Sequence, residues 1–110
     1  TEVLGGIGEN KNYEITITDC LKNITIYKGF LNKELVIGRN SRLSDVTIKE
    51  DVSISQRHFK IFEKENKIFI LDLNSANGTF VNGNETVGEI SIESNSIIKI
   101  GRTKLKVEYM

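Results

Sequence analysis

The 110-residue sequence contains no proline and no tryptophan, a single cysteine and a single histidine, and no excess charge of either sign. Cys20 has no partner for an intrachain disulfide and suits a reducing compartment, so we expect a cytoplasmic protein. The 15 basic and 15 acidic residues cancel, which gives no sign of the broad positive field that attracts nucleic acid or an anionic membrane. Any basic binding site must therefore be local, and we expect no nucleic-acid partner.

Long apolar runs are also missing. None approaches the about 18 residues of a membrane-spanning helix, and the N-terminus lacks the basic start and apolar stretch of a signal peptide, so we expect no membrane segment. Three glycines among the first ten residues predict a flexible lead-in at residues 1–11. Residues 12–110 suit one compact domain. Because the sequence does not begin with methionine, we expect this domain to belong to a longer protein.

Apolar residues mostly alternate with polar ones, which is the period of strands with one buried and one exposed face. The alternating residues are Tyr13, Ile15 and Ile17; Ile24 and Ile26; Leu35 and Ile37; Val46 and Ile48; Phe59 and Ile61; and Leu105, Val107 and Tyr109. The run from Ile68 to Leu73 is more continuously apolar, which predicts a strand buried on both faces. Helix signals are nearly absent, so we predict an all-β fold.

Turn residues separate these runs at intervals typical of a β-sandwich. They lie at Lys28-Gly29, Asn74 to Gly78, Asn82-Gly83 and Gly101-Arg102. Asn77-Gly78 and Asn82-Gly83 predict tight hairpin turns, because Asn and Gly tolerate the positive φ that such turns require. We therefore expect two packed antiparallel sheets.

Gly38-Arg39 follows the strand predicted at residues 34–37, at a sheet end where loops gather. Taken alone, this common pair indicates only a solvated arginine after a strand. Arginine nevertheless presents a planar fork of donors that matches phosphate oxygens, and a phosphate monoester is mostly dianionic at neutral pH. Arg39 is therefore a candidate phosphate anchor.

Ser55 and His58 invite a catalytic interpretation. Nucleophilic catalysis needs the imidazole within hydrogen-bond reach of the hydroxyl, an orienting carboxylate and an oxyanion site. None of these is signalled, and residues three apart in an extended segment face opposite ways unless the chain turns between them. We therefore predict that the protein is not an enzyme, and that His58 holds a loop in place.

Four short signatures follow one another with strand-like runs between them: Gly38-Arg39, Ser55-Gln56-Arg57-His58, Asn77-Gly78-Thr79 and Asn82-Gly83. In order and spacing they resemble the forkhead-associated (FHA) domain, and the likeness extends over roughly Tyr13 to Tyr109. The resemblance implies an antiparallel β-sandwich of about eleven strands with its binding loops at one end. It also implies a module that recognises phosphothreonine in a partner protein, where a Ser/Thr kinase has placed the mark.

The resemblance assigns roles to individual residues. Arg39 and Ser55 would hold the phosphate, the serine by donating its hydroxyl proton. Asn77 would hydrogen-bond the backbone of the bound peptide beside the phosphothreonine, and Gln56 would also touch that backbone. Many relatives carry an arginine directly after the serine, where this sequence has Gln56. Two alternatives therefore remain for Arg57: it makes an additional phosphate contact, or it is only a surface charge.

Three further residues would shape the loops, namely Gly38, His58 and Gly78. Before the asparagine the family often has a serine or threonine, but this sequence has Ala76, with Ser75 one residue earlier. One polar contact would therefore be missing, which supports an alternative: a phosphate-independent interaction or oligomerisation module that keeps the scaffold without a working phosphate site. For the favoured interpretation we expect no cofactor, no metal site and a monomeric isolated domain.

Overall fold

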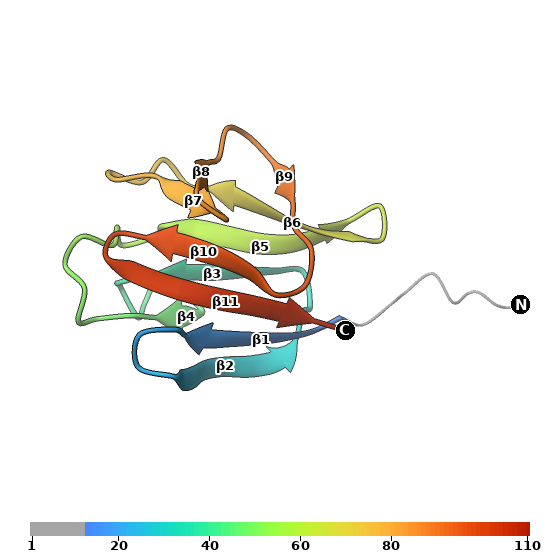
Figure 1. The fold of residues 1–110 in the computed structure, drawn as a ribbon, viewed down its shortest axis with the longest axis horizontal. Helices are drawn as coiled ribbons and strands as arrows, with labels where there is room; N and C mark the ends of the chain where they lie inside the picture. The colour runs from blue at the N-terminus through green and yellow to red at the C-terminus, as the bar shows by residue number, and fades with distance from the viewer. Residues whose placement is uncertain (1–12) are drawn as a thin grey trace, which may run out of the picture.

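In the computed structural model, which describes residues 13–110, the chain is all-β and forms two packed sheets (Figure 1). The predicted lead-in at residues 1–11 lies outside the described residues. Residues 13–110 form eleven strands: β1 (Glu14–Asp19), β2 (Ile24–Phe30), β3 (Glu34–Gly38), β4 (Val46–Thr47), β5 (Phe59–Lys64), β6 (Lys67–Asp72), β7 (Thr79–Val81), β8 (Asn84–Glu85), β9 (Ile90–Ser91), β10 (Ser96–Ile100) and β11 (Thr103–Tyr109). The predicted all-β class and strand number are confirmed. This part of the chain contains no helix of the length and apolarity needed to cross a bilayer.

One sheet has six strands in the order β2-β1-β11-β10-β7-β8, and the other has five in the order β4-β3-β5-β6-β9. Neighbouring strands are antiparallel except β3 and β4, which are parallel. The prediction of antiparallel sheets is wrong for this pair, because residues 39–45 carry the chain back along β3 before β4 begins. Asp45 fixes that return: its N–H donates to the Val36 carbonyl oxygen at 2.8 Å, and its carboxylate accepts from the Val36 N–H, also at 2.8 Å.

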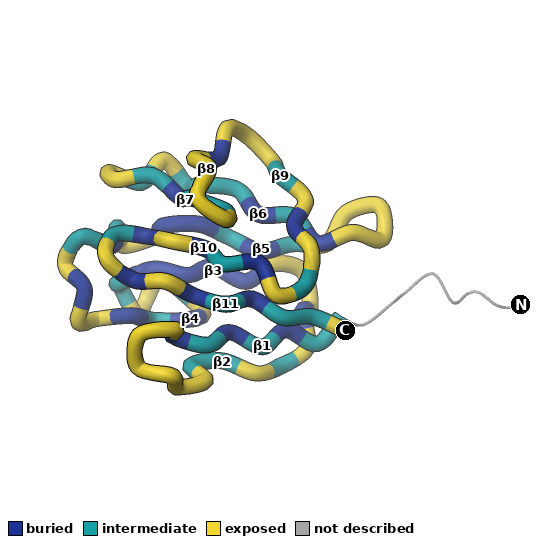
Figure 2. The backbone as a smooth tube through the Cα atoms, in the orientation of Figure 1, coloured by how far each residue is buried: buried dark blue, intermediate teal, exposed yellow. Residues whose placement is uncertain are grey.

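The core lies between the two sheets and is made mainly of buried strand residues, with a few from the connections such as Ile48 and Ile54. Buried residues recur along the strands (Figure 2). The largest fully buried hydrophobic side chains of the core are Ile15, Ile17, Ile37, Ile54, Phe59, Ile61, Ile68, Ile70, Ile98, Ile100 and Leu105. Isoleucine suits these positions because a β-branched side chain packs well on a pleated surface. In β1, β3, β5 and β11 the apolar residues of the alternating runs therefore form the core face, as predicted.

Two predictions of burial are wrong. Ile24 is 54% exposed because β2 is an edge strand of the six-stranded sheet. β6 is not buried on both faces: Ile68 and Ile70 are fully buried, whereas Phe69 between them is half-buried. Phe69 stacks on Phe62 of β5 with ring centroids 5.8 Å apart. The continuous apolar run therefore places an aromatic pair on the outer face of the sheet.

The two Asn-Gly pairs adopt different structures. Asn82 and Gly83 have positive φ (48° and 92°) and join the antiparallel strands β7 and β8, so this hairpin is confirmed. The hairpin predicted at Asn77-Gly78 is wrong, because β6 and β7 belong to different sheets. Only Gly78 of this pair has positive φ (84°), and residues 73–78 cross from one sheet to the other.

Five connections gather at one end of the sandwich, away from the C-terminus (Figure 1). They are residues 20–23, 39–45, 48–58, 73–78 and 101–102. Strand pairing brings them together, because Phe59 pairs with Asp72 in one sheet and Thr79 pairs with Ile100 in the other. All of the predicted binding residues lie on these connections or at the strand ends beside them.

Candidate functional site

The β4–β5 connection, residues 48–58, carries four of the predicted site residues in a row, and Asp51 fixes its first half. The Asp51 carboxylate accepts from the Ser53 N–H at 2.9 Å, the Arg102 N–H at 2.8 Å and the Thr103 hydroxyl at 2.7 Å, and also from the Ser53 hydroxyl. Burial by itself would raise the pKa of Asp51, but these hydrogen bonds outweigh it and hold that pKa well below its usual range. Sequence reasoning missed Asp51. Its Asp-x-Ser spacing, typical of an Asx turn, was the available signal.

Gly38 ends β3 and Arg39 follows it, at the point where the β4–β5 connection lies against this strand end. A side chain at residue 38 would overlap the carbonyl group of Gln56, so only glycine allows this close approach. Arg39 is half-buried; its backbone N–H donates to the Ser55 carbonyl oxygen at 3.0 Å and its Nε to the Ile54 carbonyl oxygen at 2.9 Å. The Nε contact orients the guanidinium, and none of the ion pairs within residues 13–110 involves it. Its Nη groups therefore remain as donors to a ligand.

Ser55 lies beside Arg39 and is held through both its backbone and its side chain. Its N–H donates to Nδ1 of His58 at 3.0 Å, and its Oγ accepts from the backbone N–H of Ala76 at 2.9 Å. A hydroxyl offers one donor and two acceptor positions. Ser55 can therefore donate its proton to a ligand oxygen while keeping the contact with Ala76.

His58 is fully buried and uses both ring nitrogens in contacts between loops. Nδ1 accepts from the Ser55 backbone, and Nε2 lies 2.8 Å from the carbonyl oxygen of Gly78. Because a carbonyl oxygen can only accept, the ring proton is on Nε2, and the neutral imidazole joins the β4–β5 and β6–β7 connections. Neither nitrogen faces the Ser55 hydroxyl, so the pair of nucleophile and base that catalysis would need is not formed.

Asp72, the last residue of β6, organises the connection to β7. Its carboxylate accepts from the Ser75 N–H at 2.9 Å and from the hydroxyls of Ser75 and Thr79, each at 2.6 Å. Burial by itself would raise the pKa of Asp72, but these hydrogen bonds hold it below its usual value. Ser75 Oγ also accepts from the Gly78 N–H at 2.9 Å. The Ser75 hydroxyl is thus used inside its own loop and does not replace the one missing at Ala76.

Asn77 is exposed and reaches back to the β4–β5 connection. Its Nδ2 donates to the Ser53 carbonyl oxygen at 2.9 Å, which is a further contact between the two connections. This contact uses one of two N–H groups on Nδ2 and leaves Oδ1 as an acceptor. The second N–H and Oδ1 are the groups that Asn77 offers to a peptide backbone.

Gln56 and Arg57 are exposed and follow Ser55 along the rim of the site. The Gln56 carbonyl oxygen accepts from the Ser44 hydroxyl at 2.8 Å and from the Asn40 N–H at 3.3 Å. The Gln56 side-chain oxygen lies 3.4 Å from Nδ2 of Asn40. Gln56 is therefore anchored to the β3–β4 connection, and its side-chain amide is left to donate. Sequence reasoning missed Asn40 and Ser44, which form this anchor.

Arg39, Ser55 and Asn77 thus present a guanidinium, a hydroxyl and a carboxamide on three connections that are hydrogen-bonded to one another. A guanidinium and a hydroxyl suit a phosphate group, and a carboxamide suits the donor and acceptor of a peptide unit. Within residues 13–110 no group of three or more His, Cys, Asp or Glu side chains is placed to hold a metal ion. The chemistry offered is recognition of an anion on an extended chain.

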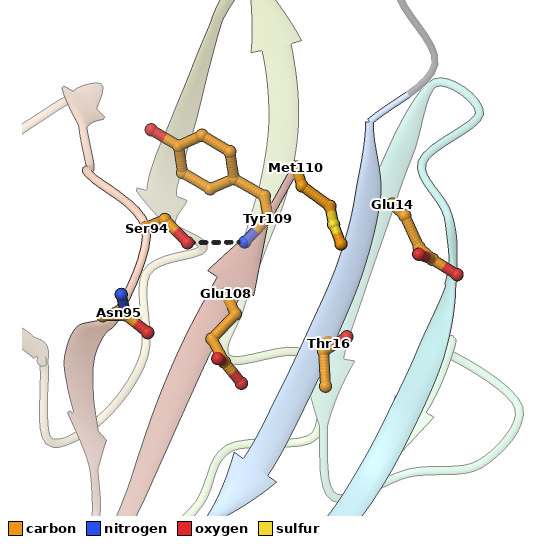
Figure 3. Close-up of a pocket in the computed structure, with 7 residues that line it drawn as sticks. All are labelled: Glu14, Thr16, Ser94, Asn95, Glu108, Tyr109 and Met110. Atoms are coloured by element: carbon orange, nitrogen blue, oxygen red, sulfur yellow. Dashed lines mark hydrogen bonds between the residues drawn. The ribbon is translucent and has the colours of Figure 1, made fainter.

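A pocket of about 180 Å³ near the C-terminus is lined by acidic side chains, unlike the loop end (Figure 3). Glu14 and Glu108 line it, and at its side the Tyr109 N–H donates to the Ser94 hydroxyl at 2.8 Å. Two carboxylates would repel a phosphate group. This pocket therefore does not compete with the loop end as a phosphate site.

Comparisons with known proteins identify the family and the fold. The family model for the FHA domain matches residues 35–101. The FHA domain of a hypothetical protein of Arabidopsis thaliana is similar with a TM-score of 0.80 and 22% identity, over 96% of this chain and 95% of that one. A domain solved for an analysis of phosphothreonine-dependent FHA domain interactions has a TM-score of 0.72 and 28% identity, over 86% and 95%. The FhaA FHA domain, solved in complex with the intracellular domain of Rv3910, has a TM-score of 0.69 and 26% identity, over 87% and 99%. A search of curated protein sequences gave no match.

Proposed function

The chain belongs to the FHA domain family, and we propose that it recognises phosphothreonine in a partner protein as one domain of a longer signalling or regulatory protein. The observation that carries the proposal is the arrangement of Arg39 and Ser55. Two hydrogen bonds hold Arg39 against residues 54 and 55, and the Ser55 oxygen is itself held by Ala76. Both groups are therefore in place before a ligand arrives, which lowers the cost of binding.

The phosphate would be bound mainly by Arg39. A hydrogen bond that involves a charged group contributes roughly 1.5 to 3 kcal/mol, and a neutral one roughly 1 kcal/mol. The Nη groups of Arg39 would donate to two phosphate oxygens, and the Ser55 hydroxyl would donate to one of them. Arg39 should therefore dominate the affinity, with Ser55 as a smaller contributor.

The peptide chain on either side would be oriented by Asn77 and Gln56. Asn77 lies on the β6–β7 connection and Gln56 on the β4–β5 connection, so the two flank Ser55 from different loops. A carboxamide that both donates and accepts can pair with one peptide unit and so fix the register of an extended segment. Gly38, His58 and Gly78 would act indirectly, by holding these loops in position.

Threonine would be preferred to serine through its γ-methyl group. Burying one methyl contributes about 0.8 kcal/mol, which corresponds to roughly fourfold discrimination. The β-branched side chain also has fewer rotamers to lose on binding, which favours threonine further. The similar domain studied for phosphothreonine-dependent interactions supports this choice of residue.

We assign no catalytic role to Ser55 or His58, because the hydroxyl and the imidazole do not face each other. The partner would carry a mark placed by a Ser/Thr kinase, and the free, exposed Cys20 suits a cytoplasmic setting. The isolated domain would act as a monomer. A second candidate function, phosphate-independent interaction, is favoured by Ala76, which brings a backbone N–H but no polar side chain to the site.

The proposal is tested by titrating the domain with degenerate peptide pools that contain a fixed phosphothreonine, a fixed phosphoserine or an unphosphorylated threonine. We expect micromolar binding of the phosphothreonine pool, weaker binding of the phosphoserine pool and none of the third. Equal binding of the phosphorylated and unphosphorylated pools would favour the phosphate-independent module. A folded protein that binds no pool would contradict the proposal.

A further inference from the structure

The arginines of this chain are confined to one region of the fold. The sequence has four, and all lie on connections at the loop end: Arg39 and Arg42 between β3 and β4, Arg57 between β4 and β5, and Arg102 between β10 and β11. The three ion pairs within residues 13–110 are all made by lysines, Lys22, Lys60 and Lys64. Arginine, the residue best shaped to bind phosphate, is thus concentrated at one end, and none of the ion pairs of the described residues involves an arginine.

The carboxylates on the same connections are engaged elsewhere. Asp45 accepts from the Val36 N–H, and Asp51 accepts four hydrogen bonds from the loop and from the β10–β11 turn. Glu50 lies 3.7 Å from Lys22. These three carboxylates keep their negative charges, but the five connections at this end carry twice as many basic residues. The basic residues are Lys22, Arg39, Arg42, Lys49, Arg57 and Arg102, so a chain without net charge has a locally positive end.

Asn40 joins the backbone of Arg42 to Gln56, the residue before Arg57. Its Oδ1 accepts from the Arg42 N–H at 2.8 Å, while its own N–H and Nδ2 contact Gln56, the neighbour of Arg57. Arg42 and Arg57 are both exposed. Their backbones are therefore held at one junction between the β3–β4 and β4–β5 connections, while their side chains are free to reach a ligand.

This junction lies close to the phosphothreonine site. Arg57 follows Ser55 by two residues, so their Cα atoms are at most about 7 Å apart. An extended peptide advances about 3.3 Å per residue. A segment whose phosphothreonine is bound by Arg39 and Ser55 would therefore carry its neighbouring residues past Arg42 and Arg57 within a few positions. Arg102 lies on the other sheet, beyond Asp51.

We infer that Arg42 and Arg57 form a second anion site, which binds a second phosphoryl group on the same peptide. The inference rests on the proposed function and narrows it, from segments with one phosphothreonine to segments with two phosphorylated residues a few positions apart. Two guanidinium groups can bind a dianionic phosphoryl group through several charge-assisted hydrogen bonds. A glutamate or aspartate side chain carries one charge in place of nearly two and should be a weaker occupant of the same site.

The test uses a peptide with one phosphothreonine, the same peptide with an added phosphoserine at each position up to about four residues away, and a version with glutamate at the best position. We expect at least one doubly phosphorylated peptide to bind about tenfold more tightly than the single one, as one charged hydrogen bond would give. Glutamate should give a smaller gain. In the double variant Arg42→Gln, Arg57→Gln, the doubly phosphorylated peptide should bind about as tightly as the singly phosphorylated one. The ratio of these two affinities should therefore fall from about ten to about one.

Arg102→Gln is the control, because it removes one positive charge, against two in the double variant, at the same end of the molecule but on the other sheet. It should keep the tenfold ratio. A ratio near one in the wild type, with the single phosphothreonine peptide still bound, would overturn this inference and leave the proposed function standing. A ratio that Arg102→Gln lowers as much as the double variant would also overturn it, since the gain would then come from the overall field. Binding of neither peptide would overturn the proposed function as well.

Discussion

The backbone N–H of Ala76 donates a hydrogen bond to Oγ of Ser55, with 2.9 Å between the two atoms. The contact joins the β6–β7 connection to the β4–β5 connection and fixes the serine oxygen while leaving its proton for a ligand. The position that lacks a polar side chain thus still builds the site through its backbone.

Ser55→Ala should weaken binding of a phosphothreonine peptide about fivefold, because roughly 1 kcal/mol of neutral hydrogen bond to the phosphate is lost. The change in unfolding free energy should be small, since the Ala76 N–H is exposed and can bond to water. Titration calorimetry measures the affinity of this variant and of the control Ser91→Ala, an exposed serine on β9, and urea unfolding measures the stability of both. Equal affinities for both variants would contradict the assigned role of Ser55.

Ala76→Ser should strengthen binding, by up to about fivefold, since the new hydroxyl adds roughly one neutral hydrogen bond at an exposed position. The same titration measures the gain, and Ala76→Val, which adds bulk without a hydroxyl, is the control. If the serine variant bound no better than the valine variant, residue 76 would not face the ligand.

His58→Phe should destabilise the fold by about 2 to 4 kcal/mol, because the Ser55 N–H and the Gly78 carbonyl would lose their partners and a larger ring must fit a fully buried site. Phosphopeptide affinity should fall as well, since both loops are held through this ring. Urea unfolding measures the first effect, with binding assayed at a temperature where the variant is folded. A loss below about 1 kcal/mol would mean that water replaces both contacts.

The domain should lose stability in acid. The pKa values of Asp51 and Asp72 are lowered in the folded state, so their stabilisation is complete above the unfolded pKa of about 3.9. As the pH falls below that value the unfolded chain takes up protons first, and stability falls toward the lowered folded pKa. Urea unfolding between pH 6 and pH 3 should show this decline. Asp72→Asn should flatten it, and an unchanged slope in that variant would contradict the assignment.

Strands β1 to β6 and β11 could be predicted from their apolar runs, most of them because alternation reports directly which face of a strand is buried. The strands β7 to β10 were not predicted in this way, and the number eleven came from the family resemblance. The sequence could not predict that Ile24 lies on an edge strand, because exposure there depends on which strands pair. It could not distinguish the two Asn-Gly pairs either. Asn82-Gly83 joins two strands of one sheet and Asn77-Gly78 joins strands of different sheets, although the local chemistry is the same.

The order of the candidate site residues was visible in the sequence, but the network that holds them was not. Asp51 contacts the backbone of Arg102, 51 residues away, and Asn77 contacts Ser53, 24 residues away. Such contacts depend on how the two sheets pack, which no local pattern records. The roles of Arg39, Ser55 and Asn77 toward a ligand stay predictions.

The account depends most directly on Arg39, and the measurement that tests it is calorimetric titration of a phosphothreonine peptide into the wild type, Arg39→Ala and Arg102→Ala. We predict micromolar binding, about −8 kcal/mol, for the wild type and for Arg102→Ala. Arg39→Ala should bind at least about tenfold more weakly, with near-native unfolding by urea. Wild-type affinity in a folded Arg39→Ala variant would contradict the central claim that this guanidinium holds the phosphate.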